Sequence, residues 1–388
     1  MMKIKYGKQD VTKDDIAAVV DVLKSDLLTQ GPIVPKFEKA VSNYTGASHA
    51  VAANSATSAL HIACMALDLG PGDLLWTTPN TFVASSNCAI YCGARVDFVD
   101  IDPLTYNMSV KKLKERLIIA KENNSLPKIL VPVHLSGQSC EMKEIKKLSV
   151  EYNFKIIEDA SHAIGASYLN SKVGSCEFSD ITVFSFHPVK IITTGEGGMA
   201  LTNDPILANR MRQHRSHGIT SNMDEMIDRP ENELWNYQQI RLGYNYRMTD
   251  IAASLGLSQL NRLQDIIQKR HQIADRYNNE LASLPLQIPW QHPDTFSSYH
   301  LYIIRLDLNS IEKSHPQIHD ELCDMGILVN FHYIPVYRQP FYEEMGFNKN
   351  YCPESERYHE QSLSIPMYPT LLIEEQDRVI SALKKVIV

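Results

Sequence analysis

Residues 184–201 read FSFHPVKIITTGEGGMAL, and this stretch decides the fold. A strand-like apolar run ends shortly before Lys190, and a second one begins after a Thr- and Gly-rich turn at residues 193–198. A lysine on the protein surface needs no such setting, whereas a lysine that must be desolvated and held against a ligand does. The stretch therefore predicts two strands with a functional lysine between them.

The same alternation extends outward from this stretch. From about residue 48, short apolar runs alternate with longer runs that have helical apolar spacing. The strand-like runs lie at residues 49–54, 74–79, 95–102, 128–135, 155–160, 181–186 and 198–203. Strands that alternate with helices predict a mostly parallel sheet covered on both faces. The expected fold class is α/β, with ligands at the carboxyl ends of the strands.

The pattern changes near residue 250. Residues 248–284 read as one or two long helices with apolar residues at three-four spacing. After a proline-containing connector come a strand, a helix, a second strand and a last helix, at residues 299–308, 318–326, 327–333 and 373–386. We therefore predict a large domain at residues 1–255 and a small C-terminal α+β domain at residues 256–388.

The composition of the 388-residue chain is that of a globular protein, and its net charge of −7 argues against a broad nucleic-acid surface. No apolar run approaches the ~20 residues of a membrane span, and the first residues lack the apolar core of a signal peptide. The seven cysteines are scattered without a Cys-x-x-Cys pair, although Cys88 and Cys92 could share a helix face. We expect buried thiols, a cytoplasmic location and no metal site.

Asp159 and Lys190 carry the chemistry expected at the edge of the sheet. Asp159 ends the apolar run KIIED, so it is expected at the carboxyl end of a central strand, and Lys190 follows the run ITVFSF. A lysine can form an imine with pyridoxal phosphate, while a carboxylate keeps the pyridine nitrogen protonated so that the ring acts as an electron sink. The pair therefore suits this cofactor. For Asp159 alone, a helix N-cap is an equally good interpretation.

A phosphate site and a stacking position accompany this pair. Ala56 and Thr57 open a predicted helix, where backbone N–H groups can bind phosphate, and Ser185, five residues before the lysine, can add a hydroxyl. Phe82 opens the next predicted helix and could stack on the pyridine ring. Taken alone, the first segment could be an ordinary helix cap and Phe82 a core residue. The combination favours a cofactor site.

Motifs along nearly the whole chain resemble the DegT/DnrJ/StrS family of nucleotide-sugar aminotransferases, which has the aspartate-aminotransferase fold of type I. The matching segments are NSATSALH, PNTFVAS, IIEDASHAIGA, FSFHPVK, GEGGM, RSHG, GYNYRMTDIAASLGLSQL and FHYIPVY. LTQGP near residue 28 and FHYIPVY further resemble the members that act in pseudaminic-acid biosynthesis.

The resemblance implies a large domain that binds pyridoxal 5'-phosphate and a homodimer whose sites are shared between subunits. The implied cofactor residues are Lys190 for the covalent imine, Asp159 for the pyridinium nitrogen, Ala56, Thr57 and Ser185 for the phosphate, Phe82 for stacking, His162 near the 3-hydroxyl, and Asn245 for the phosphate in the neighbouring subunit. For the substrate, the aromatic and imidazole side chains of FHYIPVY, namely His332, Tyr333 and Tyr337, can stack on or hydrogen-bond a sugar or nucleotide. Arg247 could contact the diphosphate, and a structural ion pair is an equally good interpretation of this residue.

The reaction that the resemblance implies is amino transfer from L-glutamate to C4 of a UDP-4-keto-6-deoxy-N-acetylhexosamine. Another UDP- or dTDP-linked keto sugar is the alternative substrate. Some members of the family catalyse dehydration with a histidine in place of the lysine, but Lys190 is present here. A nicotinamide oxidoreductase is disfavoured, because no G-x-G-x-x-G follows a predicted strand.

Overall fold

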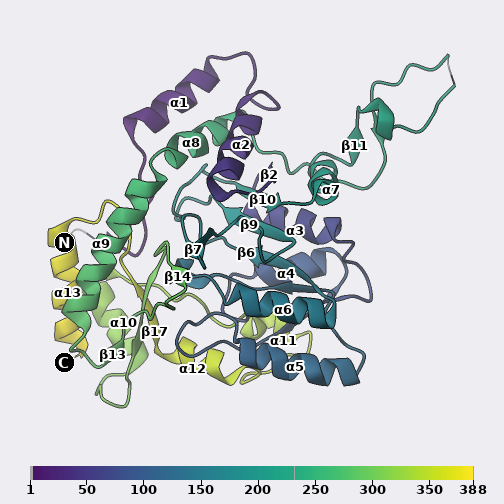
Figure 1. The fold of residues 1–388 in the computed structure, drawn as a ribbon. Coiled ribbons are helices and arrows are strands. Elements are labelled where there is room, and N and C mark those ends of the chain that lie inside the picture. The colour runs from purple at the N-terminus through teal and green to yellow at the C-terminus, as the bar shows by residue number, and fades with distance from the viewer. Residues whose placement is uncertain (1–2, 231, 388) are drawn as a thin grey trace.

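The computed structural model describes residues 3–230 and 232–387. Its central sheet consists of β2 (His49–Ala53), β3 (Leu74–Thr77), β4 (Arg95–Phe98), β5 (Ile129–Val131), β6 (Lys155–Asp159), β9 (Ile181–Ser185) and β10 (Gly198–Thr202). The strands lie in the order β2-β10-β9-β6-β5-β3-β4, and only β10 runs antiparallel to its neighbours (Figure 1). The predicted α/β class with a mostly parallel sheet is confirmed.

Helices cover both faces of this sheet. Side chains alternate between the faces along each strand, so Ile129 and Ile157 belong to one buried cluster while Leu130 and Ile156 belong to another. The first cluster includes α3 (Ala56–Ala66), α4 (Ala84–Tyr91) and α7 (Pro205–Arg215). The opposite face packs against α2 (Ile33–Thr45), α5 (Val110–Glu122), α6 (Met142–Tyr152), α8 (Asp250–Leu260) and the start of α9 (Leu263–Leu281).

A second buried core lies in the C-terminal part of the chain. It is built around the sheet β13 (Leu286–Gln287), β15 (Tyr302–Leu306) and β17 (Ser362–Ile365), with α10 (His315–Asp324) and α13 (Ile373–Ile387). Ile4 joins this core, because β1 (Ile4–Lys5) pairs in parallel with β16 (Ile327–Leu328). The first described strand therefore lies beside the last third of the chain.

The buried clusters cross the expected boundary after residue 255 in both directions. Along α9, Leu263 packs in the large core, whereas Tyr277 packs in the C-terminal core. Val336 and Tyr342 return to the core of α3 and α4. They belong to the short elements η3 (Val336–Arg338) and α11 (Pro340–Glu343), which precede α12 (Pro353–Gln361). The exact division into domains stays a prediction.

An arm extends from the body of the molecule between α7 and α8 (Figure 1). It carries β11 (Ile219–Thr220), η2 (Met223–Glu225) and β12 (Gln238–Gln239). Ile227 and Leu234 are exposed apolar side chains on this arm. The remaining elements are the helix α1 (Lys13–Leu23) and the short segments η1 (Leu135–Gly137), β7 (Ser167–Tyr168), β8 (Ser171–Lys172) and β14 (Thr295–Phe296).

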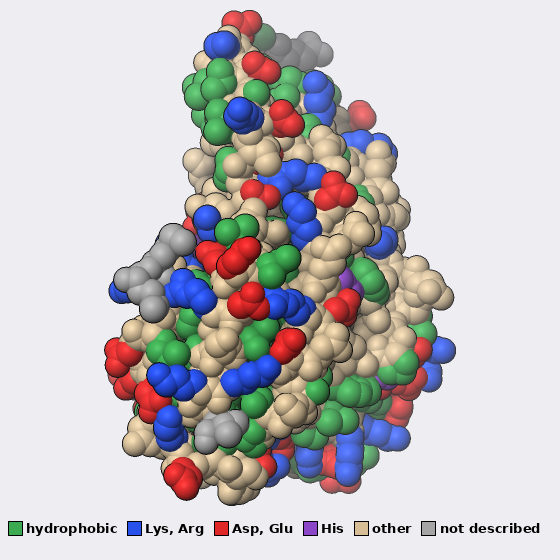
Figure 2. All heavy atoms as spheres, turned by 90° about the vertical axis from the view of Figure 1, so that its left-hand side faces the viewer, with side chains coloured by type: hydrophobic (Ala, Val, Ile, Leu, Met, Phe, Trp, Pro, Cys, Tyr) green, Lys and Arg blue, Asp and Glu red, His purple; other side chains and the backbone are tan. Residues whose placement is uncertain are grey.

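Figure 2 shows the face that lies on the left of Figure 1, where α9 and α13 are found. Basic and acidic side chains are intermixed across this face, without a continuous field of one sign. Across residues 3–230 and 232–387, no helix is both long enough and apolar enough to cross a bilayer.

Candidate functional site

The carboxyl ends of β6 and β9 bring the motif residues together. Asp159 lies opposite Val183 in the parallel pairing of these strands, so Asp159 and Ser185 stand at the same edge of the sheet. On the other side of β9, Gly198 pairs with Ser185 and also with Ala53, the last residue of β2. The edge expected from the sequence is present.

Asp159 is 4% exposed, and its carboxylate accepts three hydrogen bonds. The Ser85 hydroxyl donates to Oδ2 at 2.6 Å, and Ser161 donates to Oδ1 from its backbone N–H at 3.1 Å and its hydroxyl at 2.6 Å. No helix begins after Asp159, because residues 160–166 form turns. The N-cap interpretation of Asp159 is therefore wrong. These donors fix the Asp159 carboxylate at the end of a central strand.

Lys190 lies in a turn after β9, where its backbone N–H donates to the His187 carbonyl at 2.9 Å. Its side chain is partly exposed. Burial lowers the pKa of Lys190 to about 8, while the negative charge of Asp159 acts in the opposite direction. Among the described residues, no hydrogen bond or ion pair holds its amine. The amine is therefore available to a ligand and is neutral more often than an ordinary lysine amine.

The turn after the lysine closes the loop around it. The backbone N–H of Thr194 and the hydroxyl of Thr193 both donate to the Phe186 carbonyl, at 3.0 and 2.8 Å. Gly195 has a φ of +81°, a conformation that favours glycine. At Gly198 a Cβ atom would lie 2.4 Å from the backbone nitrogen of Ala56. The Gly-rich segment thus lets the start of α3 approach the sheet edge closely.

The start of α3 offers backbone donors beside Ser185. Ser55 caps the helix by accepting from the Ser58 N–H at 3.1 Å. The N–H groups of Ala56 and Thr57 precede the first intrahelical bond, so the helix itself supplies them with no acceptor. Because the missing Cβ of Gly198 creates the space for this turn, the cradle fits a phosphate group. The roles of these residues in phosphate binding stay a prediction.

Phe82 lies between β3 and α4, two residues before the helix begins at Ala84. Its side chain is 60% exposed. The interpretation of Phe82 as a core residue is therefore wrong, and the start of the helix was predicted two residues early. An exposed ring at this edge can stack on a planar ligand, which stays a prediction.

His162 is a buried imidazole whose hydrogen bonds define its tautomer. The Ser136 N–H donates to its Nδ1 at 3.2 Å, so its proton belongs on Nε2, which lies 3.2 Å from the Tyr333 hydroxyl oxygen. Burial lowers the pKa of His162 well below its ordinary value, and the positive charge of Lys190 adds to the effect. His162 is therefore neutral at pH 7 and directs the Tyr333 O–H away from itself as a donor.

Three further residues of this region were not singled out by the sequence reasoning. Ser85 and Ser161 bond to Asp159, and the His300 ring lies 4.4 Å from that of His162, centre to centre. Both serines stand inside the quoted motifs PNTFVAS and IIEDASHAIGA, so the motifs contained them without indicating their role. Nothing in the local sequence marks His300, which lies two residues before β15 and reaches His162 through the tertiary fold.

The structure buries two of the substrate residues expected from the sequence, Tyr337 and His332. Tyr337 is 0% exposed, packs in the core with Phe98, and its hydroxyl donates to Glu356 at 2.9 Å. The expectation that Tyr337 contacts the sugar is therefore wrong. His332 is buried, bonds through Nδ1 to the Ser364 hydroxyl at 2.8 Å, and burial lowers its pKa to about 3.

Arg247 and Asn245 lie in the segment before α8. Arg247 is partly exposed, and the Asn245 side chain is exposed while its backbone bridges to Ser216. The carbonyl of Asn245 accepts from the Asn54 amide at 3.5 Å, which places this segment beside the start of α3. The predicted contacts of Arg247 with substrate and of Asn245 with a neighbouring cofactor stay predictions.

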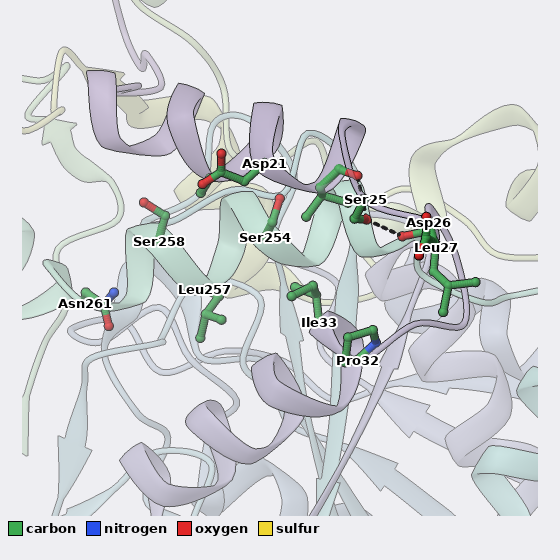
Figure 3. A pocket seen from close by; sticks show the side chains of 12 residues that line it. Asp21, Ser25, Asp26, Leu27, Pro32, Ile33, Ser254, Leu257, Ser258 and Asn261 are labelled. Atoms are coloured by element: carbon green, nitrogen blue, oxygen red, sulfur yellow. Dashed lines mark hydrogen bonds between the residues drawn. The ribbon is translucent and has the colours of Figure 1, made fainter.

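A large cavity lies away from this edge, between α1 and α8 (Figure 3). It holds about 600 Å³ and is lined by Asp21 and Asp26 together with serines and apolar side chains, without a lysine or arginine. Carboxylates repel a diphosphate, so this cavity does not suit a nucleotide sugar. A much smaller cavity beside Lys190 is bordered by Lys8, Asp10 and Arg270.

Relatives of the chain share its full length. Residues 9–384 match the DegT/DnrJ/EryC1/StrS aminotransferase family. The chain is 37% identical to the UDP-4-amino-4,6-dideoxy-N-acetyl-beta-L-altrosamine transaminase of Campylobacter jejuni, covering 99% of this chain and 98% of that protein. It is 35% identical to the spore coat polysaccharide biosynthesis protein SpsC of Bacillus subtilis, covering 99% and 97%.

Solved structures agree with this relationship. Helicobacter pylori PseC, an aminotransferase involved in the biosynthesis of pseudoaminic acid, superimposes with a TM-score of 0.88 at 32% identity over 99% of both chains. The PLP form of the putative sugar aminotransferase Spr1654 from Streptococcus pneumoniae gives 0.87 at 30% identity, over 99% and 98%. With Lys190 and Asp159 at one sheet edge, the chain is a pyridoxal-phosphate-dependent aminotransferase that belongs to the DegT/DnrJ/EryC1/StrS family.

Proposed function

We propose that this enzyme transfers the amino group of L-glutamate to C4 of a UDP-linked 4-keto-6-deoxy-N-acetylhexosamine, as in pseudaminic-acid biosynthesis. The observation that carries the proposal is the Lys190 amine near the Asp159 carboxylate, which three hydrogen bonds hold in place. It is supported by the full-length similarity to a transaminase named for a UDP-linked 4-amino sugar.

The residues at the edge fit the cofactor from three sides. Asp159 offers a fixed negative charge for the protonated ring nitrogen, the first turn of α3 and Ser185 offer donors for the phosphate, and Phe82 offers an exposed ring for stacking. When bound, pyridoxal phosphate supplies an electron sink that makes the proton labile on the substrate carbon that carries the amino nitrogen. The protein's part is to hold that ring and to move the proton.

Lys190 is the group that moves the proton. A neutral amine is required to accept it, and a pKa of about 8 leaves roughly a tenth of the amine neutral at pH 7, against less than a thousandth for an ordinary lysine. The same amine returns the proton to C4 of the sugar. Because the lysine serves both halves of the cycle, its replacement removes both half-reactions.

The Tyr333 hydroxyl is the best-placed donor for a substrate oxygen. His162 donates to it, so its own proton points away from His162, and His162 stays neutral through burial. Arg247 would meet the diphosphate, and His332 would contribute only the small part of its ring that remains accessible. These contacts select oxygen acceptors on the sugar rather than amino groups.

We further propose that the active form is a homodimer. The exposed apolar arm between α7 and α8 needs a partner surface, and the Asn245 side chain projects from the same segment without burial in its own chain. Asn245 would reach the phosphate site of the other subunit.

The experiment that tests the substrate is a panel assay. Purified enzyme loaded with pyridoxal phosphate receives glutamate and, one at a time, UDP- and dTDP-linked 4-keto-6-deoxy sugars with and without an N-acetyl group, and 2-oxoglutarate is followed. Fastest turnover is expected with the UDP-linked N-acetyl sugar. Fastest turnover with a dTDP-linked sugar would reject this substrate and leave the aminotransferase assignment intact.

A further inference from the structure

A line of two hydroxyl groups runs from the start of α4 to the carboxylate of Asp159. The Ser85 hydroxyl oxygen lies 2.6 Å from Oδ2 of Asp159, and the Thr81 hydroxyl oxygen lies 2.6 Å from that of Ser85. All three residues are buried. Solvent therefore does not compete for these bonds, and their geometry is set by the fold.

The two hydrogen bonds of this line have a fixed direction. The Ser85 proton lies toward Asp159, because a bond of 2.6 Å to a carboxylate is stronger than the alternative bond of 3.3 Å to the Phe82 carbonyl. Since its own proton is committed in this way, Ser85 accepts the proton of Thr81. Each bond polarises the next, so Thr81 makes Ser85 a stronger donor to the carboxylate.

The two oxygens of the Asp159 carboxylate differ in how many donors they already have. Each carboxylate oxygen can accept about two hydrogen bonds. Oδ1 accepts two, from the Ser161 backbone N–H at 3.1 Å and from the Ser161 hydroxyl at 2.6 Å. Among the described residues, Oδ2 accepts one, from Ser85. The place for a further donor is therefore on Oδ2, the same oxygen that Ser85 bonds.

We propose that Ser85, supported by Thr81, is a positioning residue that keeps the ring proton of the cofactor on its nitrogen. The inference rests on the function proposed above, in which Asp159 meets the protonated ring nitrogen of pyridoxal phosphate. Hydrogen bonds to a carboxylate stabilise its charged form and so make it a weaker base. A weaker base at Oδ2 leaves the shared proton on the ring, and the protonated ring is the electron sink that the reaction needs.

The substitution Ser85→Ala removes the donor to Oδ2. The carboxylate then becomes a stronger base, and the proton between it and the ring moves from nitrogen toward oxygen. From the usual strength of a hydrogen bond to a charged group, the ratio of ring-protonated to ring-unprotonated cofactor should fall roughly 10- to 150-fold. Thr81→Val leaves the bond from Ser85 in place, so it should act in the same direction and to a smaller extent.

The test reconstitutes the full-length enzyme with pyridoxal phosphate that is isotopically labelled at the ring nitrogen, and it measures the NMR resonance of that nitrogen. In Ser85→Ala the resonance is expected to move from its wild-type position toward that of the unprotonated ring. Thr81→Val keeps the shape of the side chain and carries the same test should Ser85→Ala fail to fold. A resonance that coincides with that of the wild type, in whichever of the two variants carries the test, overturns the proposal.

Two serine substitutions serve as matched controls. Ser161→Ala removes a bond of the same 2.6 Å length from the other oxygen, Oδ1, so it should move the resonance less than Ser85→Ala does. Ser86 is the next residue on α4 and is also buried, but its hydroxyl bonds that of Tyr342 at 2.6 Å. Ser86→Ala should therefore leave the resonance at its wild-type position, and equal moves in Ser85→Ala and Ser86→Ala would also overturn the proposal.

The kinetics of the half-reaction with glutamate separates positioning from substrate binding. Because the ring proton assists proton removal, Ser85→Ala should lower the maximal rate and leave the glutamate concentration that gives half of it unchanged. A change in that concentration alone would contradict the proposed role of Ser85.

Asp159→Asn separates a failure of this inference from a failure of the proposed function, because it replaces the carboxylate itself. A ring-nitrogen resonance that stays in place in Asp159→Asn would show that Asp159 does not meet the ring nitrogen. A resonance that moves in Asp159→Asn and stays in place in Ser85→Ala would refute the role of Ser85 alone.

Discussion

Replacing Gly198 with alanine tests whether the start of α3 holds the cofactor phosphate. The added Cβ would lie 2.4 Å from the Ala56 nitrogen, about 1 Å inside an ordinary van der Waals contact, so the first turn of α3 must move by roughly that distance. Such a shift breaks a hydrogen bond to a charged group, which is worth about 1.5–3 kcal/mol. The dissociation constant for pyridoxal phosphate should therefore rise roughly 10- to 150-fold.

The assay is titration of the cofactor-free protein with pyridoxal phosphate, followed by its absorbance, with thermal unfolding measured before the cofactor is added. Gly70→Ala is the matched control, because no atom lies within 4 Å of the Cβ it would add. Ser185→Ala is a second variant that introduces no steric strain, and it should weaken the binding of pyridoxal phosphate through the lost hydroxyl alone. A folded Gly198→Ala protein that binds the cofactor as tightly as the wild type would refute the proposed phosphate site.

Four further outcomes are expected. Borohydride reduction should fix the cofactor to Lys190, and Lys190→Ala should keep cofactor binding while losing turnover by several orders of magnitude; attachment to Lys172 would contradict this. Asp159→Asn should lower turnover sharply in a folded protein, and near-normal activity would show that its charge is dispensable. Burial lowers the pKa of Lys190 to about 8, so the folded state disfavours the charged amine. Between about pH 8 and the ordinary lysine pKa, the free energy of unfolding of the cofactor-free wild type should therefore rise with pH relative to that of Lys190→Met. A difference between the two proteins that does not change with pH would contradict the buried setting of Lys190. Mixing inactive Lys190→Ala with Asn245→Asp chains should restore part of the activity, and no recovery after proven subunit exchange would mean that each site is built from one chain.

Local sequence was sufficient to predict the sheet edge. Asp159 ends one strand and Lys190 follows another, and the carboxyl ends of parallel strands share one edge, so their proximity followed from the pattern. The donors to Asp159 could not be predicted in the same way. Ser85 lies on α4, 74 residues before Asp159 in the chain, and it reaches the carboxylate through packing that no local pattern encodes.

The C-terminal part shows where tertiary contacts override local pattern. Residues 327–333 were expected to form one strand, yet β16 covers only Ile327–Leu328, the two residues that pair with β1. Tyr337 sits in an aromatic motif that suited a ligand contact, but Phe98 and Glu356 enclose it. In both cases a segment distant in sequence determines the outcome.

The pairing of β1 with β16 has a consequence for the order of events during synthesis. Ile4 cannot dock until Ile327 has left the ribosome, and at ordinary translation rates that interval is roughly 15–65 s. The large sheet, whose strands end at Thr202, can form well before then. The N-terminal strand therefore waits beside a nearly finished domain, and a chaperone that shields Ile4 would act in that window.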